Sequence, residues 1–340
     1  MGAVIERQEL HDAASKAFPA DALKPDRDES WKLVTEMGWL MLSLSEEAGG
    51  LGLGRDSAAA IHYEMGKALA TAPLIPAMAT VQAIGAATEL ADQAGWIERV
   101  TTGEFVTTNL RAGDVTGDGD KLSGTLPAVP DADMASHVMI ANPGRAALVP
   151  LDAPGVTVTE KPLWDESRRL FDVTLDGYSI DPALVMATGD AAEALTRRLK
   201  GEMIFALAAD SLGGANTILD LTVEYLNTRK QFDRPLGMFQ ALQHRCADLK
   251  VLIGAAEALL WSRSVQPQAG MAEIGGLKAH AAEVYRWVCE EAIQLHGGVG
   301  LTEEMYVHLF MKRANLNVQL GGDADLWREL VGREALAAYA

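Results

Sequence analysis

The residues between about 101 and 185 interrupt a chain whose pattern is otherwise helical. In this stretch Val, Thr and Leu occur in short runs, separated by Gly, Asp and Pro, at residues 105–108, 137–141, 147–149, 155–159 and 172–176. Short runs of this kind at close spacing are typical of a compact antiparallel β domain. A chain with such a block in its middle cannot be a helical bundle from end to end.

Helical periodicity occurs on both sides of this block. Apolar residues such as Ile61, Met65 and Leu69 recur at helical spacing before it, and a glycine loop at 46–54 separates two helices there. After it, long helical segments are predicted near 190–230, 239–265, 271–296 and 302–317, which favours an antiparallel bundle. We therefore expect an α+β chain with three domains: an N-terminal α-helical domain at 1–100, a middle antiparallel β domain at 101–188 and a C-terminal four-helix bundle at 189–340.

Charge and cysteine content limit the partners and the compartment. The chain has 29 Lys and Arg against 47 Asp and Glu, a net charge of −18, so we expect no nucleic-acid partner. Cys246 and Cys289 lie in apolar helical stretches, which suits a reducing compartment better than a disulfide framework. The start has no export signal, and no apolar run is long enough to span a membrane. We expect a cytoplasmic protein with no membrane partner and no metal site.

The first candidate binding motif follows the first long helix of the C-terminal half. Arg229 and Phe232 are three residues apart, so we expect them on one helix face, before the segment 233–237 ends the helix. Such a face offers a cation and an aromatic ring. Taken alone, the pair also fits a helix C-terminus with a favourable Arg and a core Phe.

The second candidate motif is Gln294-Leu-His-Gly-Gly298, where an apolar helix ends in glycines. Glycine permits a positive φ and the close approach of a ligand's pyrophosphate, although a plain glycine cap has the same appearance. A helix precedes these glycines, whereas the glycine motif of a nicotinamide site follows a strand. A Rossmann-type site is therefore not expected here.

Taken together, the motifs resemble those of the acyl-CoA dehydrogenase family in order and spacing over nearly the whole chain. The segments that carry the resemblance are Gly38-Trp39, the loop Glu46-Glu-Ala-Gly-Gly-Leu-Gly52, Glu64-Met-Gly-Lys-Ala-Leu69, Arg229-Lys-Gln-Phe232, Phe239-Gln240 and Gln294-Leu-His-Gly-Gly-Val-Gly-Leu-Thr-Glu-Glu304. The family's fold has the same order of helical, β and bundle domains. The resemblance implies an FAD enzyme that dehydrogenates acyl-CoA thioesters.

In that family, FAD lies across a subunit interface, and one subunit binds the adenosine and pyrophosphate end of its neighbour's cofactor. Carried over, the resemblance assigns this role to Arg229, Phe232, Gln240, Gln294, Gly297 and Gly298. The residue types suit it, because Arg offers a fork of donors to a diphosphate and glycines allow close approach.

The family's catalytic carboxylate is missing at both of its usual positions. One of them is Gly321, and the other is Met203, with Glu202 one residue away. Because a helix turns about 100° per residue, Glu202 points in another direction than Met203. Glu202 is the first candidate for a displaced base, Asp323 and Asp325 are lesser candidates, and the catalytic residue stays unassigned.

The family's flavin-ring segments also depart from the pattern: residues 107–115 and 124–130 stand in their place without the usual aromatic residue. The resemblance is thus to the shorter, non-catalytic-type subunit of heterotetrameric (α2β2) bacterial acyl-CoA dehydrogenases. We expect a second family member as partner, an acyl-CoA substrate that could be a steroid side-chain CoA ester, and electron-transfer flavoprotein as acceptor. The alternatives are a homotetrameric dehydrogenase with a displaced base, and a non-catalytic scaffold with the family fold.

Overall fold

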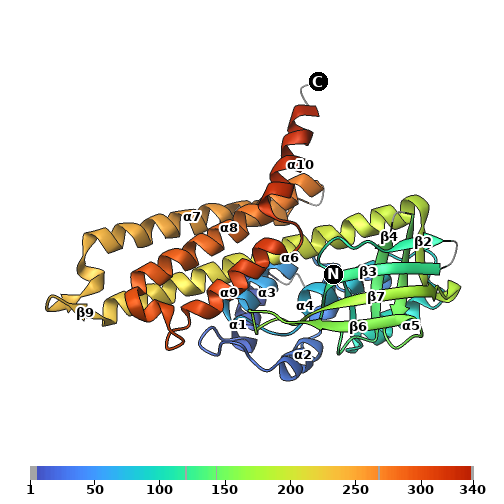
Figure 1. Ribbon diagram of the computed structural model, residues 1–340, viewed down its shortest axis with the longest axis horizontal. Coiled ribbons are helices and arrows are strands. Elements are labelled where there is room, and N and C mark those ends of the chain that lie inside the picture. Colours follow the sequence, from blue (N-terminus) through green and yellow to red (C-terminus); the bar gives the residue numbers. More distant parts are fainter. Residues whose placement is uncertain (1–5, 119–120, 143, 267–268, 338–340) are drawn as a thin grey trace. The chain divides into compact units, whose positions relative to one another are not determined.

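A computed structural model describes residues 6–118, 121–142, 144–266 and 269–337. The chain divides into two compact units: unit 1 comprises Met1–Pro25, Ala59–Ala70 and Ile204–Ala340, and unit 2 comprises Asp26–Ala58 and Thr71–Met203. The order of helical, β and helical regions expected from the sequence is confirmed (Figure 1). The exact boundaries of the three predicted domains stay a prediction.

Unit 2 contains two four-stranded sheets. The first has the order β1-β4-β5-β8 and the second β2-β3-β7-β6. Most neighbours pair antiparallel, as expected, but β1 pairs with β4 in parallel. Valines of β3, β4, β5 and β7 are buried in one apolar core. The strands are β1 (Val106–Thr108), β2 (Thr116–Asp118), β3 (Lys121–Pro130), β4 (His137–Asn142), β5 (Arg145–Pro150), β6 (Val156–Lys161), β7 (Leu170–Ser179) and β8 (Val185–Thr188).

The whole helices of unit 2 are α2 (Arg27–Glu36), α4 (Leu74–Gly85) and α5 (Gln93–Thr101), with the 3-10 turns η1 (Trp39–Met41), η2 (Glu46–Ala48) and η3 (Pro182–Leu184). Unit 2 also contains the first part of α6 (Gly189–Thr228), up to Met203. Helix α4 is apolar on all sides and almost entirely buried, as a core helix must be. The predicted glycine loop is present, and it begins with η2, which Ser45 caps.

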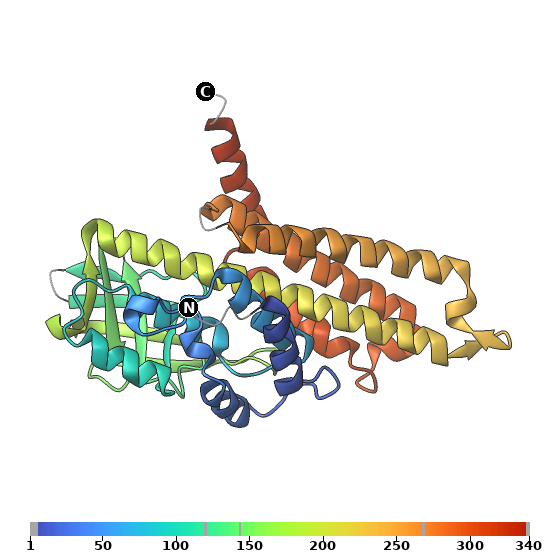
Figure 2. The same ribbon diagram turned by 180° about the vertical axis from the view of Figure 1, so that it is seen from behind.

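Unit 1 consists mainly of long helices that lie side by side, as both ribbon views show (Figure 2). The helices of unit 1 are α1 (Arg7–Ala17), most of α3 (Arg55–Lys67), α6 (Gly189–Thr228) from Ile204 onward, α7 (Gln240–Ser264), α8 (Met271–His296), α9 (Val307–Gln319) and α10 (Ala324–Ala337). Of these, α6 to α9 lie side by side. The four segments predicted after residue 189 match α6 to α9. Helix α10 was not predicted. It projects from the bundle, and Trp327 is its one buried residue in the described part of the chain.

Helices α3 and α6 approach so closely in unit 1 that only glycine fits at the contact. A Cβ atom on Gly213 would lie 1.9 Å from the carbonyl oxygen of Tyr63, and one on Gly66 would lie 2.1 Å from that of Asp210. A larger residue at either position would force the helices apart. These glycines set the distance between the two backbones.

A buried ion pair connects three segments of unit 1. Arg313 of α9 is 1% exposed, and its Nη1 donates to Oδ1 of Asp210 on α6 at 3.0 Å. Its Nη2 donates to the carbonyl oxygen of Ala70 at 3.1 Å, and Asn317 Nδ2 donates to Oδ2 of Asp210 at 2.7 Å. Buried charges are tolerated when they are paired and hydrogen-bonded in this way.

A second buried cation holds the turn that follows α9. The Lys278 side chain on α8 is fully buried, and its Nζ donates to the carbonyl oxygens of Val318 at 3.0 Å and Gly322 at 2.6 Å. Burial lowers the pKa of Lys278 to about 8, although the charge of Asp323 acts in the opposite direction. The turn is also held by Trp327, whose Nε1 donates to the carbonyl oxygen of Gly321 at 3.0 Å.

We predict that Arg313→Met lowers the free energy of unfolding by about 3–5 kcal/mol, because it leaves the Asp210 carboxylate buried without its charge partner. Urea unfolding followed by circular dichroism measures this. Arg333→Met is the matched control, since Arg333 pairs with Glu329 on the surface and should cost below about 1 kcal/mol. Equal losses in the two variants would contradict the prediction.

We also predict that the stability of the wild type rises with pH between about 8 and 10.4 relative to that of Lys278→Met. In this window the unfolded chain holds a proton on Lys278 that the folded chain has released, so raising the pH favours folding, by at most about 1.4 kcal/mol per pH unit. Urea unfolding at several pH values gives the difference between the two proteins. A pH-independent difference would contradict the lowered pKa.

Candidate active site

The first predicted binding motif lies in a small hairpin after α6. The helix ends at Thr228, and Arg229 donates its backbone N–H to the carbonyl oxygen of Tyr225 at 2.8 Å. The two short strands β9 (Lys230–Gln231) and β10 (Arg234–Pro235) then pair antiparallel at the end of the bundle (Figure 1). The prediction that Arg229 and Phe232 share a helix face is therefore wrong, because the helix has ended before either residue.

Phe232 occupies the tip of this hairpin. Phe232 and Asp233 both have positive φ, +53° and +59°, as a two-residue hairpin turn requires. A left-handed backbone costs roughly 1–2 kcal/mol for a residue other than glycine. The Phe232 ring is 84% exposed and has one ring neighbour among the described residues, Phe239, at 6.2 Å between centroids.

The hairpin also presents cations. Arg234 lies over the Phe239 ring, with its guanidinium carbon 4.0 Å from the centroid. Arg229 is exposed, and within the described part of the chain its guanidinium has no acceptor. Gln240 is the first residue of α7, and its side chain is exposed beside the hairpin. A cation, a ring and an amide are thus available to a ligand here.

The second predicted motif ends α8. Gln294 is exposed on the last turn, and Gly297 leaves the helix with φ +65° to begin the 3-10 turn η5 (Gly297–Leu301). A Cβ atom on Gly297 or Gly298 would meet nothing within 4 Å. The backbone at this point is open to a ligand that requires close approach.

A contact between Tyr225 and His296 joins the two motifs. Their rings are stacked, with centroids 4.3 Å apart and planes 20° apart, and the Tyr225 hydroxyl donates to the carbonyl oxygen of His296 at 3.3 Å. Arg229 follows Tyr225 by one helical turn, and Gly297 follows His296 directly. The structure therefore brings the residues of both motifs to one end of the bundle.

Sequence reasoning did not single out Tyr225 or His296, although His296 lies inside the glycine motif. Burial lowers the pKa of His296, and its Nδ1 is hydrogen-bonded to the carbonyl oxygen of Ala292 at 2.8 Å. The imidazole is thus a packing and hydrogen-bonding group at neutral pH. Both residues line a cavity of about 220 Å³ together with Ile218, Leu221, Glu224, Thr228, Met305, Tyr306 and Val307.

The position of the family's usual base holds a glycine with positive φ and little room for a side chain. Gly321 has φ +68°, and a Cβ atom on it would lie 3.1 Å from Leu207 and 3.3 Å from Ile204. The neighbouring turn is held by Lys278 and Trp327. A glutamate at this place would be strained as well as crowded.

The displaced-base candidates are all engaged in other contacts. Glu202 receives a fork of hydrogen bonds from Arg55, with Nη2 to Oε1 at 2.7 Å and Nε to Oε1 at 3.2 Å. Asp323 caps α10 by accepting the backbone N–H of Leu326 at 2.9 Å. Asp325 is almost fully exposed to solvent beside Arg328. Their roles as bases stay hypotheses.

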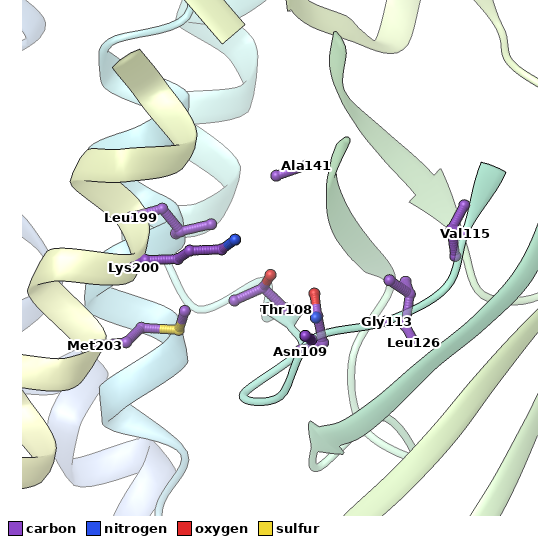
Figure 3. A pocket seen from close by; sticks show the side chains of 10 residues that line it. Thr108, Asn109, Gly113, Val115, Leu126, Ala141, Leu199, Lys200 and Met203 are labelled. Atoms are coloured by element: carbon purple, nitrogen blue, oxygen red, sulfur yellow. The ribbon is translucent and has the colours of Figure 1, made fainter. Parts of the chain in front are cut away.

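The segments expected at the flavin ring line a cavity within unit 2. Its volume is about 180 Å³, and Figure 3 shows the polar ends of Lys200, Thr108 and Asn109 directed into it. Met203 lies at its edge, whereas Glu202 does not line it. The lining residues are Thr108, Asn109, Ala112, Gly113, Val115, Leu126, Ala141, Leu199, Lys200 and Met203, with no aromatic residue among them.

Two general properties complete the description of the site. No cluster of His, Cys, Asp and Glu that could hold a metal ion is found in the described part of the chain. Among those same residues, no helix combines the length and the apolar character needed to cross a membrane.

Comparison with known proteins identifies relatives along the whole chain. The N-terminal domain of acyl-CoA dehydrogenases matches residues 5–104, and the C-terminal domain of acyl-CoA dehydrogenases matches residues 196–336. The acyl-CoA dehydrogenase IpdE2 of Mycobacterium tuberculosis is 33% identical over 331 residues, which cover 93% of this chain and 92% of the relative.

Two solved structures have the same fold. A variant of the Tcur3481-Tcur3483 steroid ACAD is 27% identical with a TM-score of 0.83, and the match covers 98% of this chain and 99% of that one. The ChsE4-ChsE5 complex from Mycobacterium tuberculosis is 24% identical with a TM-score of 0.84, and 99% of each chain is covered.

Proposed function

This chain belongs to the acyl-CoA dehydrogenase family, and from that premise we propose that it is one subunit of a heteromeric enzyme whose FAD lies at the interface with a second family member. FAD is the cofactor of the family and accepts the hydride that leaves the acyl-CoA thioester. In this proposal, the chain binds the adenosine and pyrophosphate end of that FAD. The partner supplies the ring pocket and the catalytic base.

The observation that carries the proposal is the open surface formed by the two motifs. Within the described residues the Arg229 guanidinium is unpaired, Phe232 has an exposed ring, and Gly297 and Gly298 leave the backbone uncovered. Arginine can donate two parallel hydrogen bonds to a phosphate, and an exposed ring can pack against an adenosine. These residues therefore fit the anionic half of FAD, with Gln240 and Gln294 as additional donors and acceptors at the edge of the site.

The unit 2 cavity fits the flavin ring poorly. Its volume of about 180 Å³ is below the range of roughly 300–1,000 Å³ that is usual for small-molecule pockets. It also has no aromatic side chain to pack against a tricyclic ring. We therefore assign the ring pocket to the partner.

The absence of a free carboxylate at the expected positions also supports the assignment of the catalytic base to the partner. A general base must reach the proton that it removes, within hydrogen-bonding distance. Gly321 offers no side chain, and the Glu202 carboxylate is bound by Arg55. In the proposed α2β2 enzyme, the α-proton is removed by a residue of the partner.

The proposal also includes a substrate class, an electron acceptor and a cellular compartment. The steroid ACAD among the similar structures supports a bulky acyl-CoA, such as a steroid side-chain CoA ester, as substrate. Electron-transfer flavoprotein is the proposed electron acceptor, and the proposed location is the cytoplasm. The two rival functions are a homotetrameric dehydrogenase with Glu202 or Asp323 as base, and a scaffold without catalytic function.

Purification of the chain alone and together with a second acyl-CoA dehydrogenase family member from the same genome tests the proposal. We expect FAD absorbance and dehydrogenase activity only in the co-purified complex, because each partner holds part of the site. The measurements are FAD per heterodimer and turnover with a panel of acyl-CoA esters. FAD and activity in the chain alone would favour the homotetramer, and a complex without flavin would favour the scaffold.

We further predict that Gly298→Leu lowers the FAD content of the complex at least tenfold while the chain keeps its stability. The φ of Gly298 is not positive, and a Cβ atom would meet nothing within 4 Å, so the folded chain tolerates the side chain. The same side chain fills the space that the pyrophosphate would need. Arg229→Gln should also lower FAD content, whereas Arg333→Gln, at a surface site on α10, should not. Unchanged FAD content in Gly298→Leu would contradict the assignment.

A further inference from the structure

The cavity of unit 2 has the features of a binding site that the proposed function does not use. Its lining combines the apolar residues Val115, Leu126, Ala141, Leu199 and Met203 with the polar residues Thr108, Asn109 and Lys200. In Figure 3 the apolar groups and the polar ends face the same space. A ligand that fills this cavity must therefore be amphipathic.

The polar lining residues favour an anion as ligand. Lysine carries a compact positive charge, and in the described part of the chain the Lys200 ammonium has no carboxylate or other acceptor. No Asp or Glu lines the cavity among the described residues, although the chain as a whole has a net charge of −18. Arg197 lies one helical turn before Lys200 and adds a second positive charge along the same side of α6.

The amide of Asn109 adds a directional group. One N–H of its Nδ2 is used by the carbonyl oxygen of Arg111, at 2.5 Å, which fixes the side chain at the cavity. The second N–H and the Oδ1 atom have no partner within the described residues. An ammonium and an amide N–H together can hold the two oxygens of one carboxylate.

The size of the cavity limits the rest of the ligand. At about 180 Å³ it has the volume of roughly six water molecules, since each takes about 30 Å³ in the liquid. A short aliphatic chain fits this space beside the apolar lining residues. We propose that this cavity binds a small free carboxylate with a short aliphatic chain, held by Lys200 and Asn109.

The proposed ligand differs from an acyl-CoA substrate in its chemistry. In a thioester the carboxylate has become a neutral carbonyl, so the interaction with Lys200 that selects the free acid is lost. The site lies entirely on this chain's own unit 2, and it requires neither FAD nor a partner. Its test is therefore independent of the flavin measurements described above.

Saturation-transfer NMR and titration of the full-length chain with sodium butanoate test the proposal. We expect saturable binding of butanoate, and binding at least tenfold weaker for butanamide, which has the same shape without the charge. The affinity of the chain for the carboxylate should increase roughly fourfold for each methylene from acetate to butanoate, because each methylene is buried against apolar lining residues. Absence of saturable butanoate binding, or equal binding of butanamide, overturns the proposal.

Two variants on the same helix distinguish a specific site from general attraction. Lys200→Gln should weaken butanoate binding at least tenfold, and Lys200→Arg should keep most of it. Arg198→Gln removes the same charge two residues away, from a side chain that does not line the cavity, and should change binding less than twofold. Thermal melts establish that the variants fold. Equal effects of Arg198→Gln and Lys200→Gln, or binding of butyryl-CoA in place of butanoate, overturn the proposal.

Discussion

The buried ion pair between Arg313 and Asp210 is the interaction on which unit 1 depends. Moving two charges out of water is costly, and the cost is recovered only when both side chains keep their partners. Arg313 therefore holds α9 against α6 and against the chain after α3 at the same time. The glycine contacts between α3 and α6 act with it, because they bring the backbones close enough for the pair to be shielded. The ends of α6 and α8 are joined by a separate contact, the stacking of Tyr225 on His296.

Much of the architecture could be predicted from periodicity alone. The helices α6 to α9 and the strands β1, β4, β5, β6 and β7 appear where the helical spacing and the short Val, Thr and Leu runs indicated. Helix α10 was missed, and in the described part of the chain it buries only one side chain, that of Trp327. The parallel pairing of β1 with β4 has no local signal, because the partner strand lies far along the sequence.

The candidate site could be predicted in part. The residue types of the two motifs indicated an anion-binding surface with open glycines, and the structure leaves those groups exposed. The hairpin after α6 could not be predicted, because Phe232-Asp233 lacks the Asn-Gly or Asp-Gly signature of such turns. The stacking of Tyr225 on His296 joins residues that are far apart in the sequence, and only the folded bundle shows it. Lys200 could not be predicted either, because the sequence does not distinguish it from other lysines and only the folded chain places it at the cavity.

The hairpin tip has a consequence for how a complex would assemble. A ring at the end of a flexible loop loses conformational entropy when it is fixed by a partner, and each immobilised side chain of this kind costs roughly 0.5–1.5 kcal/mol. Phe232 stands instead on a turn closed by paired strands, so much of its backbone freedom is already lost in the free chain. Such preorganisation lowers the entropy cost of association. The cost of the left-handed backbone at this turn is therefore part of the free energy of folding. It does not reduce the free energy of association.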